Sequence, residues 1–171
     1  MAEDTVELMR QLEIDSAVIV GYSDGGIIGI DMAIHHPERV AKLAVTGANS
    51  RADGYTAENL EWVRTFKPVD LPVSDAYARL SPDGPDHWPI VLERLQRMWP
   101  VEPNFTYEEM RSIKAPTLII IGDGDIVTPE HAVEMFHTIP HAQLCVVPDT
   151  GHGAMPAETV LRFLEHDTVT S

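Results

Sequence analysis

Three side chains in this sequence could together activate a serine. Ser23 lies in a Gly-x-Ser-x-Gly pattern at residues 21–25, Asp125 in a Gly-x-x-Asp pattern at 122–125, and His152 between two glycines at 151–153. A serine hydroxyl is a weak nucleophile at neutral pH, so it needs a base, and the base needs a group that orients it. We therefore predict nucleophilic attack by Ser23, with His152 as the general base and Asp125 as the carboxylate that fixes the imidazole.

The pattern around Ser23 lies where a strand should turn into a helix. The apolar run from Ser16 to Gly21 predicts a strand, and residues 25–36 predict a mostly apolar helix that ends before Pro37. A serine on such a sharp turn needs neighbours without a Cβ atom, and glycines stand at positions 21, 25 and 26. The helix would point its amino end at the serine, so the backbone N–H of Asp24 could face a developing oxyanion. The simpler alternative is a tight turn in which Ser23 only caps the helix.

Further strands and helices alternate along the chain. Strands are expected at Val40 to Thr46, Thr117 to Gly122 and Gln143 to Val147. Helices are expected at 5–12, at 129–138 after an N-cap at Thr128, and from Pro156 to about residue 165. This order predicts an α/β fold whose parallel sheet is flanked by helices and whose first strand is covered on both faces. Ser23, Asp125 and His152 would then share the carboxyl edge of the sheet.

With these residues and this order, the chain resembles the α/β-hydrolase family from Thr5 to Glu165. The resemblance places the family's acid on Asp125 and its histidine on His152, with Asp123 as the second choice of acid. It implies one α/β-hydrolase-like domain over residues 1–171 that corresponds to the C-terminal part of the fold.

Only 22 residues precede Ser23. Family members carry several strands there, together with a loop for a second oxyanion donor. We therefore expect weakened activity and a homo-oligomer that covers the exposed sheet edge.

A helical cap insertion is expected at approximately 48–115. Seven of the 13 prolines divide this stretch into short helices near 56–66, 86–99 and 107–113. It also holds all three tryptophans and eight of the eleven aromatic residues. The candidates for lining a substrate pocket are Tyr22, Trp62, Phe66, Trp88, Trp99 and Met155. The alternative is that the aromatic residues of the insertion only pack its helices onto the sheet.

Composition narrows the possible partners. The net charge is −15, so we expect neither nucleic acid nor an anionic membrane as a partner. No apolar run approaches the roughly 20 residues that span a bilayer. The N-terminus is acidic and Cys145 is the single cysteine, so we expect a cytoplasmic protein.

The remaining histidines and glycines do not suggest a cofactor. No histidine pair has metal-ligand spacing, and His131, His137 and His141 are expected on the surface, so we predict no metal. The Gly-x-Gly at 122–124 lacks the third glycine of a dinucleotide-binding loop, because position 127 is Val. We expect no cofactor.

The resemblance implies a serine hydrolase that cleaves carboxylic esters of small neutral substrates through an acyl-enzyme. Carbon–carbon bond hydrolases, perhydrolases and haloperoxidases of the family share the same three residues. A different class of function also fits: a non-catalytic ligand-binding protein, or an inactive remnant of the fold.

Overall fold

The computed structural model describes residues 1–67, 69 and 71–165 of the 171-residue chain. The chain divides into two compact units, of which residues 51–104 form the second and the flanking segments form the first. The second unit lies within the insertion expected at 48–115.

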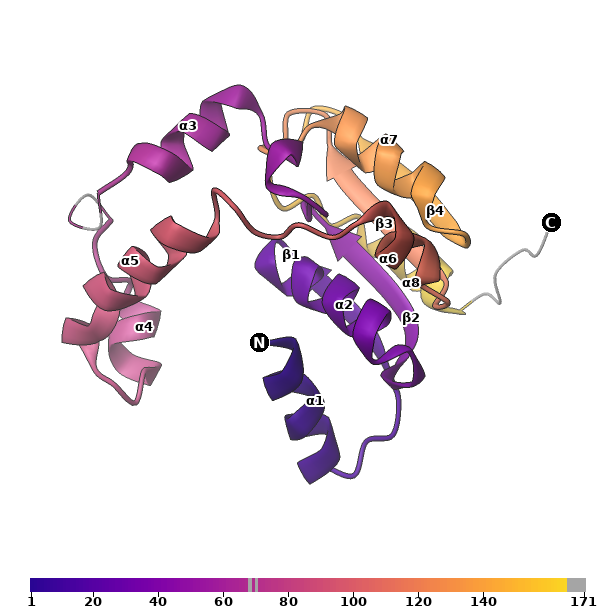
Figure 1. Ribbon diagram of the computed structural model, residues 1–171, viewed down its shortest axis with the longest axis horizontal. Helices are drawn as coiled ribbons and strands as arrows, with labels where there is room; N and C mark the ends of the chain where they lie inside the picture. Colours follow the sequence, from indigo (N-terminus) through magenta and orange to yellow (C-terminus); the bar gives the residue numbers. More distant parts are fainter. Residues whose placement is uncertain (68, 70, 166–171) are drawn as a thin grey trace. The chain divides into compact units, whose positions relative to one another are not determined.

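The first unit contains a parallel sheet of four strands in the order β1-β2-β3-β4 (Figure 1). The strands are β1 (Ala17–Tyr22), β2 (Val40–Thr46), β3 (Thr117–Gly122) and β4 (Ala142–Val147). The fold class predicted from the sequence is confirmed, and each predicted strand agrees with an observed one to within a residue at either end. All four strands therefore end at one edge of the sheet.

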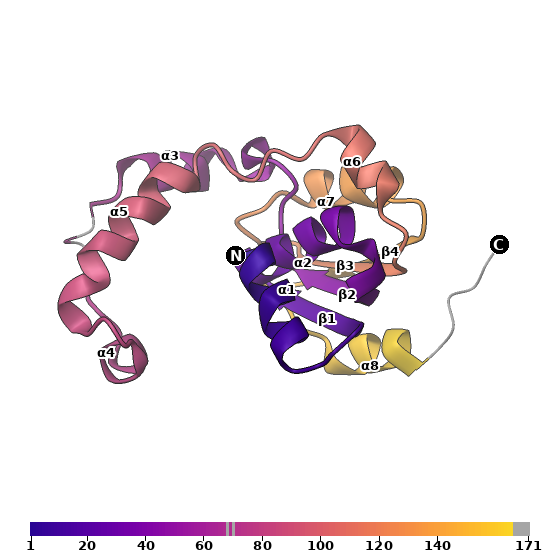
Figure 2. The same ribbon diagram turned by 60° about the horizontal axis from the view of Figure 1, so that its bottom comes forward.

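Helices cover both faces of this sheet. Figure 2 shows α2 (Asp24–His35) and α7 (Pro129–Thr138) on one side of the sheet and α8 (Ala157–Glu165) on the other. α1 (Ala2–Gln11) and α6 (Tyr107–Ser112) both contact α2, and a short 3-10 helix (Pro37–Arg39) leads into β2. α7 begins as predicted, because the Thr128 hydroxyl accepts a hydrogen bond from the His131 N–H.

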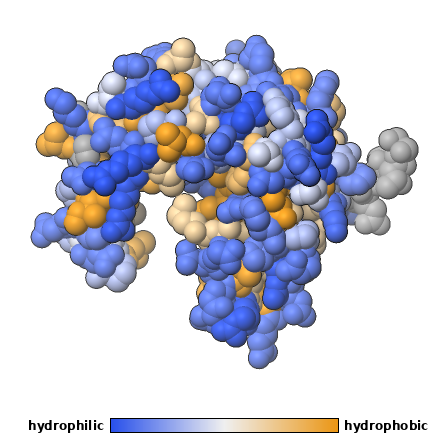
Figure 3. Space-filling model, in the orientation of Figure 1, coloured by the Kyte–Doolittle hydropathy of each residue, from blue (hydrophilic) through white to orange (hydrophobic). Residues whose placement is uncertain are grey.

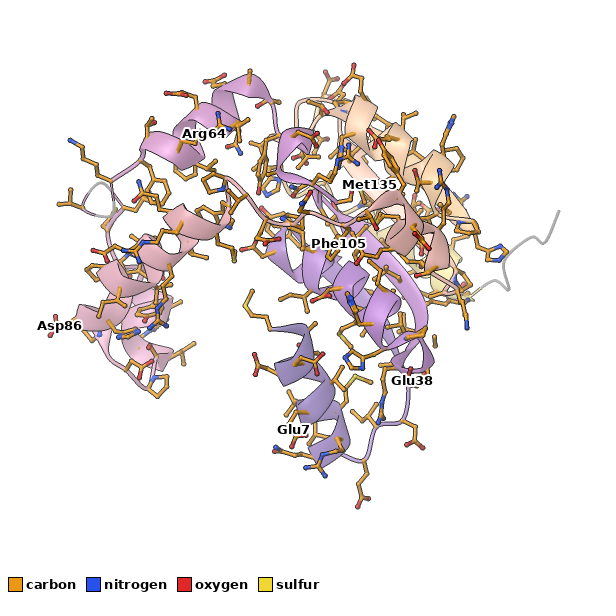
Figure 4. The ribbon with its side chains drawn as sticks, viewed as in Figure 1. Glu7, Glu38, Arg64, Asp86, Phe105 and Met135 are labelled. Carbon is orange, nitrogen blue, oxygen red and sulfur yellow. The ribbon has the colours of Figure 1, made fainter. Side chains whose placement is uncertain are left out.

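The core follows from the apolar composition of β3, which is buried along its whole length. Leu118 and Ile120 pack with Phe163 of α8 on one face of the sheet. On the α7 side, Met135 is buried (Figure 4). A strand covered on both faces needs no polar alternation, which is why Thr117–Gly122 is an unbroken apolar run.

β1 differs from this expectation. Val18 is 45% exposed and Val20 is 47% exposed, so the prediction that the first strand is covered on both faces is wrong. On its other face, Ile19 lies close under Gly29 of α2. The buried cluster around α8 includes residues of β2 and β3 but none of β1, and no strand of the described chain pairs with the outer edge of β1.

The second unit is built from short helices: a 3-10 turn (Ala52–Gly54), α3 (Ala57–Thr65), α4 (Asp75–Leu80), another 3-10 turn (Pro85–His87) and α5 (Trp88–Met98). Its two ends are joined by a bridge between Arg51 and Asn104. The sequence predicted α3 and α5 but missed α4, which Ser74 caps through its hydroxyl. α6 was expected within the insertion and belongs to the first unit.

The molecular face in Figure 3 is mostly hydrophilic, with scattered hydrophobic residues. This agrees with a net charge of −15. Within the described part of the chain, no helix has the length and apolar character needed to cross a bilayer.

Candidate active site

Ser23 occupies a strained turn between β1 and α2. Its φ is 53° and its ψ is −125°, a combination that costs a non-glycine residue about 1–3 kcal/mol. The turn is held by its backbone: the Ser23 N–H donates to the Thr46 carbonyl at 2.9 Å, and the N–H groups of Gly26 and Ile27 donate to the Ser23 carbonyl. The turn places the serine directly after the carboxyl end of β1 and before the first turn of α2.

Two of the three glycines at this turn are needed for space. A Cβ atom on Gly21 would overlap the Gly25 carbonyl, and one on Gly26 would lie 2.8 Å from the Ala48 Cβ. A Cβ atom on Gly25 would meet nothing within 4 Å. The expectation that Gly25 also supplies room is therefore wrong, because its Cβ direction is open.

The structure brings the three predicted side chains together. His152 Nε2 lies 3.1 Å from Ser23 Oγ, and His152 Nδ1 lies 2.8 Å from Asp125 Oδ1. The Asp125 side chain is fully buried, whereas the His152 side chain keeps 21% of its surface exposed. A buried carboxylate beside Nδ1 favours the tautomer with the proton on Nδ1, which leaves the Nε2 lone pair facing the serine hydroxyl. His152 Nε2 can therefore accept the proton of the Ser23 hydroxyl.

The competing carboxylates lie elsewhere. Asp123 Oδ1 accepts a hydrogen bond from the Thr150 N–H at 3.2 Å and thus ties down the loop before His152. Asp149 is exposed. Asp125 Oδ1 also accepts the Val127 N–H at 3.1 Å, which fixes the carboxylate from its own loop. Of the two candidate acids, Asp125 and Asp123, Asp125 is the one bonded to His152.

Two further residues frame the imidazole, and sequence analysis assigned neither of them this role. Gly47, the residue after β2, has a φ of +59°, and a Cβ atom there would lie 2.8 Å from His152 Cε1 and Nδ1. The Tyr22 ring lies 4.9 Å from the His152 ring, at an interplanar angle of 47°. Gly47 could have been found from its place directly after a strand at the same sheet edge.

The predicted pocket residues separate into three groups. Tyr22 lies at the site, and Met155, 43% exposed, follows His152 by three residues. Trp62, Phe66 and Trp99 cluster inside the second unit, with ring centroids 5.0–6.4 Å apart. Trp88 pairs with Tyr77 at 4.8 Å in that unit. Within the second unit these aromatic side chains pack against one another.

His131 corrects another expectation. The sequence placed it on the surface, but it is 5% exposed, because Ser50 offers its imidazole a buried hydrogen-bond partner. His137 and His141 are exposed, as predicted. In the described ranges, no group of three or more His, Cys, Asp or Glu side chains could hold a metal ion.

Comparison with known proteins agrees with this architecture. The model of the alpha/beta hydrolase family matches residues 1–163, and the chain belongs to that family. RutD of Rhizobium rhizogenes, provisionally named a carbamate hydrolase, is 27% identical, with 96% of this chain and 72% of RutD covered. The human serine hydrolase BPHL is 26% identical, with 88% of this chain and 53% of BPHL covered.

Among solved structures, the meta-cleavage product hydrolase CumD of Pseudomonas fluorescens has a TM-score of 0.70 and 26% identity. The match covers 95% of this chain and 67% of CumD. The chain thus spans about half the length of BPHL and about two thirds to three quarters of the other two proteins.

Proposed function

We propose that the protein is a serine hydrolase that cleaves carboxylic esters of small neutral substrates. The observation that carries this proposal is the continuous contact from Ser23 Oγ to His152 Nε2 and from His152 Nδ1 to Asp125. The strained turn at Ser23 supports it, because backbone strain tends to persist at sites where it serves the chemistry. Membership of the alpha/beta hydrolase family supports the hydrolase class.

In the proposed reaction, Ser23 Oγ attacks the acyl carbon while its proton passes to His152 Nε2. The carbonyl π electrons move to oxygen, and the backbone N–H of Asp24, the first residue of α2, would stabilise that oxyanion from the positive end of the helix. The C–O bond to the alcohol then breaks, and His152 returns the proton to the departing oxygen. Water, deprotonated by His152, releases the acid from the acyl-enzyme.

The backbone N–H of Asp24 is the oxyanion donor that we assign within the described residues, and removal of one such donor typically lowers the rate by about a hundred- to a thousandfold. The Tyr22 ring offers apolar surface beside His152, and the net charge of −15 disfavours anionic substrates.

A second candidate reaction is hydrolysis of a carbon–carbon bond. The similarity to CumD, a meta-cleavage product hydrolase, favours it. The alternative from a different class is a ligand-binding protein that keeps the three side chains without turnover. Both hydrolases need the Ser23 hydroxyl, so turnover that is lost in Ser23→Ala, with an ester or with a carbon–carbon substrate, separates them from that alternative.

The test is hydrolysis of p-nitrophenyl acetate by the wild type, by Ser23→Ala and by Ser16→Ala, in which an exposed serine is removed as a control. We expect turnover in the wild type and in Ser16→Ala and its loss in Ser23→Ala. Equal rates in all three proteins, or no turnover in any, would favour the ligand-binding alternative. A 2-hydroxy-6-oxo-dienoate in the same assay tests the carbon–carbon candidate.

We also propose that copies of the chain associate along β1. This edge strand has no partner on its outer side within the described chain, and it exposes Val18 and Val20. An open edge of this kind favours pairing with another chain.

We also propose a reducing, cytoplasmic location for the protein, because Cys145 is its single cysteine.

A further inference from the structure

A second serine–histidine pair lies behind the site, between the loop after β2 and helix α7. The Ser50 N–H donates a hydrogen bond to His131 Nε2 at 3.1 Å, and Ser50 Oγ lies 3.1 Å from the same nitrogen. Ser50 is 2% exposed and His131 is 5% exposed, so this pair has little access to a substrate. Its role must be exerted through what it holds in place.

The bond defines the state of the imidazole. A ring nitrogen that accepts a hydrogen bond from a backbone N–H must carry its lone pair, so the proton of neutral His131 is on Nδ1. Nδ1 lies 4.0 Å from Glu134 Oε2, one turn further along α7. His131 therefore acts as a buried acceptor for the backbone of residue 50.

The segment that this bond anchors forms one wall of the site. Residues 47–50 are all buried, and Gly47 lies against the bonded pair of His152 and Asp125. The Gly47 N–H donates to the Ile120 carbonyl at 3.1 Å, and the Ser50 carbonyl accepts the Phe105 N–H at 3.0 Å. The segment is thus tied to β3 at one end and to α7 and Phe105 at the other.

The same segment also contacts the turn that carries the serine. The Ala48 Cβ lies where a Cβ atom on Gly26 would be only 2.8 Å away, so Ala48 packs closely on the first turn of α2. A shift of residues 47–50 would therefore disturb both the imidazole and the turn at Ser23. In a close-packed interior, such a shift passes directly to the neighbouring groups.

We propose that His131 is a positioning residue for Ser23 and His152, acting through its hydrogen bond to Ser50. This proposal rests on the proposed function, because it assigns His131 a part in activating the Ser23 hydroxyl. Without this bond the Ser50 end of the segment keeps its tie to Phe105 but loses its tie to α7, so Gly47 holds the imidazole less firmly at its 2.8 Å and 3.1 Å contacts.

The test uses a fluorophosphonate, which reacts with an activated serine without depending on the natural substrate. The Ser23 Oγ–P bond forms, the P–F bond breaks, fluoride leaves, and the serine proton passes to His152. The second-order rate of labelling is measured per folded molecule, with the folded fraction taken from circular dichroism. Loss of stability alone changes the folded fraction and leaves this rate unchanged.

Variants at position 131 test whether the labelling rate depends on a hydrogen-bond acceptor at the position of His131 Nε2. Gln can place its Oε1 near the position of Nε2, whereas Asn carries the same amide one methylene shorter and Leu carries no acceptor. We expect His131→Asn and His131→Leu to label about ten- to a hundredfold more slowly than the wild type. We expect His131→Gln to restore most of the rate. His137→Gln, on the exposed side of the same helix, is the matched control and should label like the wild type.

The outcomes divide clearly. Slow labelling of Asn and Leu with rescue by Gln supports the proposal, and the Asn and Gln pair decides the matter if the Leu variant does not fold. Wild-type labelling in every variant, or a Gln variant as slow as Leu, would overturn the role of His131 and leave the proposed function standing. A wild type that does not label at all would overturn both.

Discussion

A substitution of Gly47 is the most direct test of how the loop after β2 positions the imidazole of His152. An added Cβ atom at this position would lie 2.8 Å from both Cε1 and Nδ1 of His152 and 3.3 Å from Asp125 Oδ2. Ordinary contacts begin at 3.4 Å, so in Gly47→Ala the imidazole must move by about 0.6 Å or the loop must retreat by as much. Either movement disturbs the relay, by which we mean the two hydrogen bonds that link Asp125 to His152 and His152 to Ser23.

The expected effect has two components. An alanine at a φ of +59° is strained and should lower the free energy of unfolding by about 1–2 kcal/mol. Misplacement of a catalytic group by about 1 Å can cost a hundredfold in rate, so a shift of this size should slow fluorophosphonate labelling of Ser23 by about tenfold or more. The Nδ1 to Oδ1 contact of 2.8 Å is the bond most exposed to the clash.

Gly84→Ala is the matched control. Gly84 also has a positive φ, of +76°, but a Cβ atom there would meet nothing within 4 Å. Both variants should be less stable in urea unfolding, and Gly47→Ala alone should lose labelling rate per folded molecule. If Gly47→Ala labelled as fast as Gly84→Ala, the idea that Gly47 holds His152 in place would be refuted.

Three further predictions concern other parts of the molecule. Asp125→Asn should lower ester turnover by about 10⁴-fold, because the amide favours the wrong histidine tautomer, whereas Asp123→Asn should stay close to the wild type; steady-state kinetics of both variants compares the two acids. Glu7, exposed on α1 (Figure 4), has its pKa lowered from 4.5 to about 2, chiefly by the hydrogen bond from Arg10. Its contribution to stability is therefore present above about pH 4.5 and lost as the pH falls toward 2, and an NMR titration of the carboxyl carbon in Arg10→Ala should show the pKa return toward 4.5. Val20→Glu, which places a charge on the exposed face of β1, should shift the proposed homo-oligomer toward monomer in sedimentation velocity, and a wild type that stays monomeric at micromolar concentration would contradict that proposal.

The sequence predicted what depends on short segments. The run at Thr117–Gly122 and the cap at Thr128 each carry their signal within a few residues, and both elements lie where they were expected. Asp125 was ranked above Asp123 on the family resemblance, and it is the carboxylate that bonds to His152. The order of the strands then brings Ser23 to the same sheet edge.

What the sequence could not predict depends on distant partners. The apolar residues of β1 resemble those of a strand covered on both faces. Val18 and Val20 are nevertheless exposed, because the buried cluster around α8 includes β2 and β3 but not β1. His131 was expected on the surface, and its burial could not be predicted because its hydrogen-bond partner, Ser50, lies 81 residues earlier in the chain. Such pairs follow from tertiary packing, which no local pattern records.

The site thus depends on the loop after β2 as much as on the three residues that the motifs identify. Ser23, Asp125 and His152 follow three different strands, and none of their loops contains the segment that lies between them. That segment, residues 47–50, contacts the imidazole through Gly47, the turn at Ser23 through Ala48, and α7 through Ser50. Since the relay tolerates displacements of only a fraction of an ångström, the buried bond that fixes this segment belongs to the same functional unit as the relay.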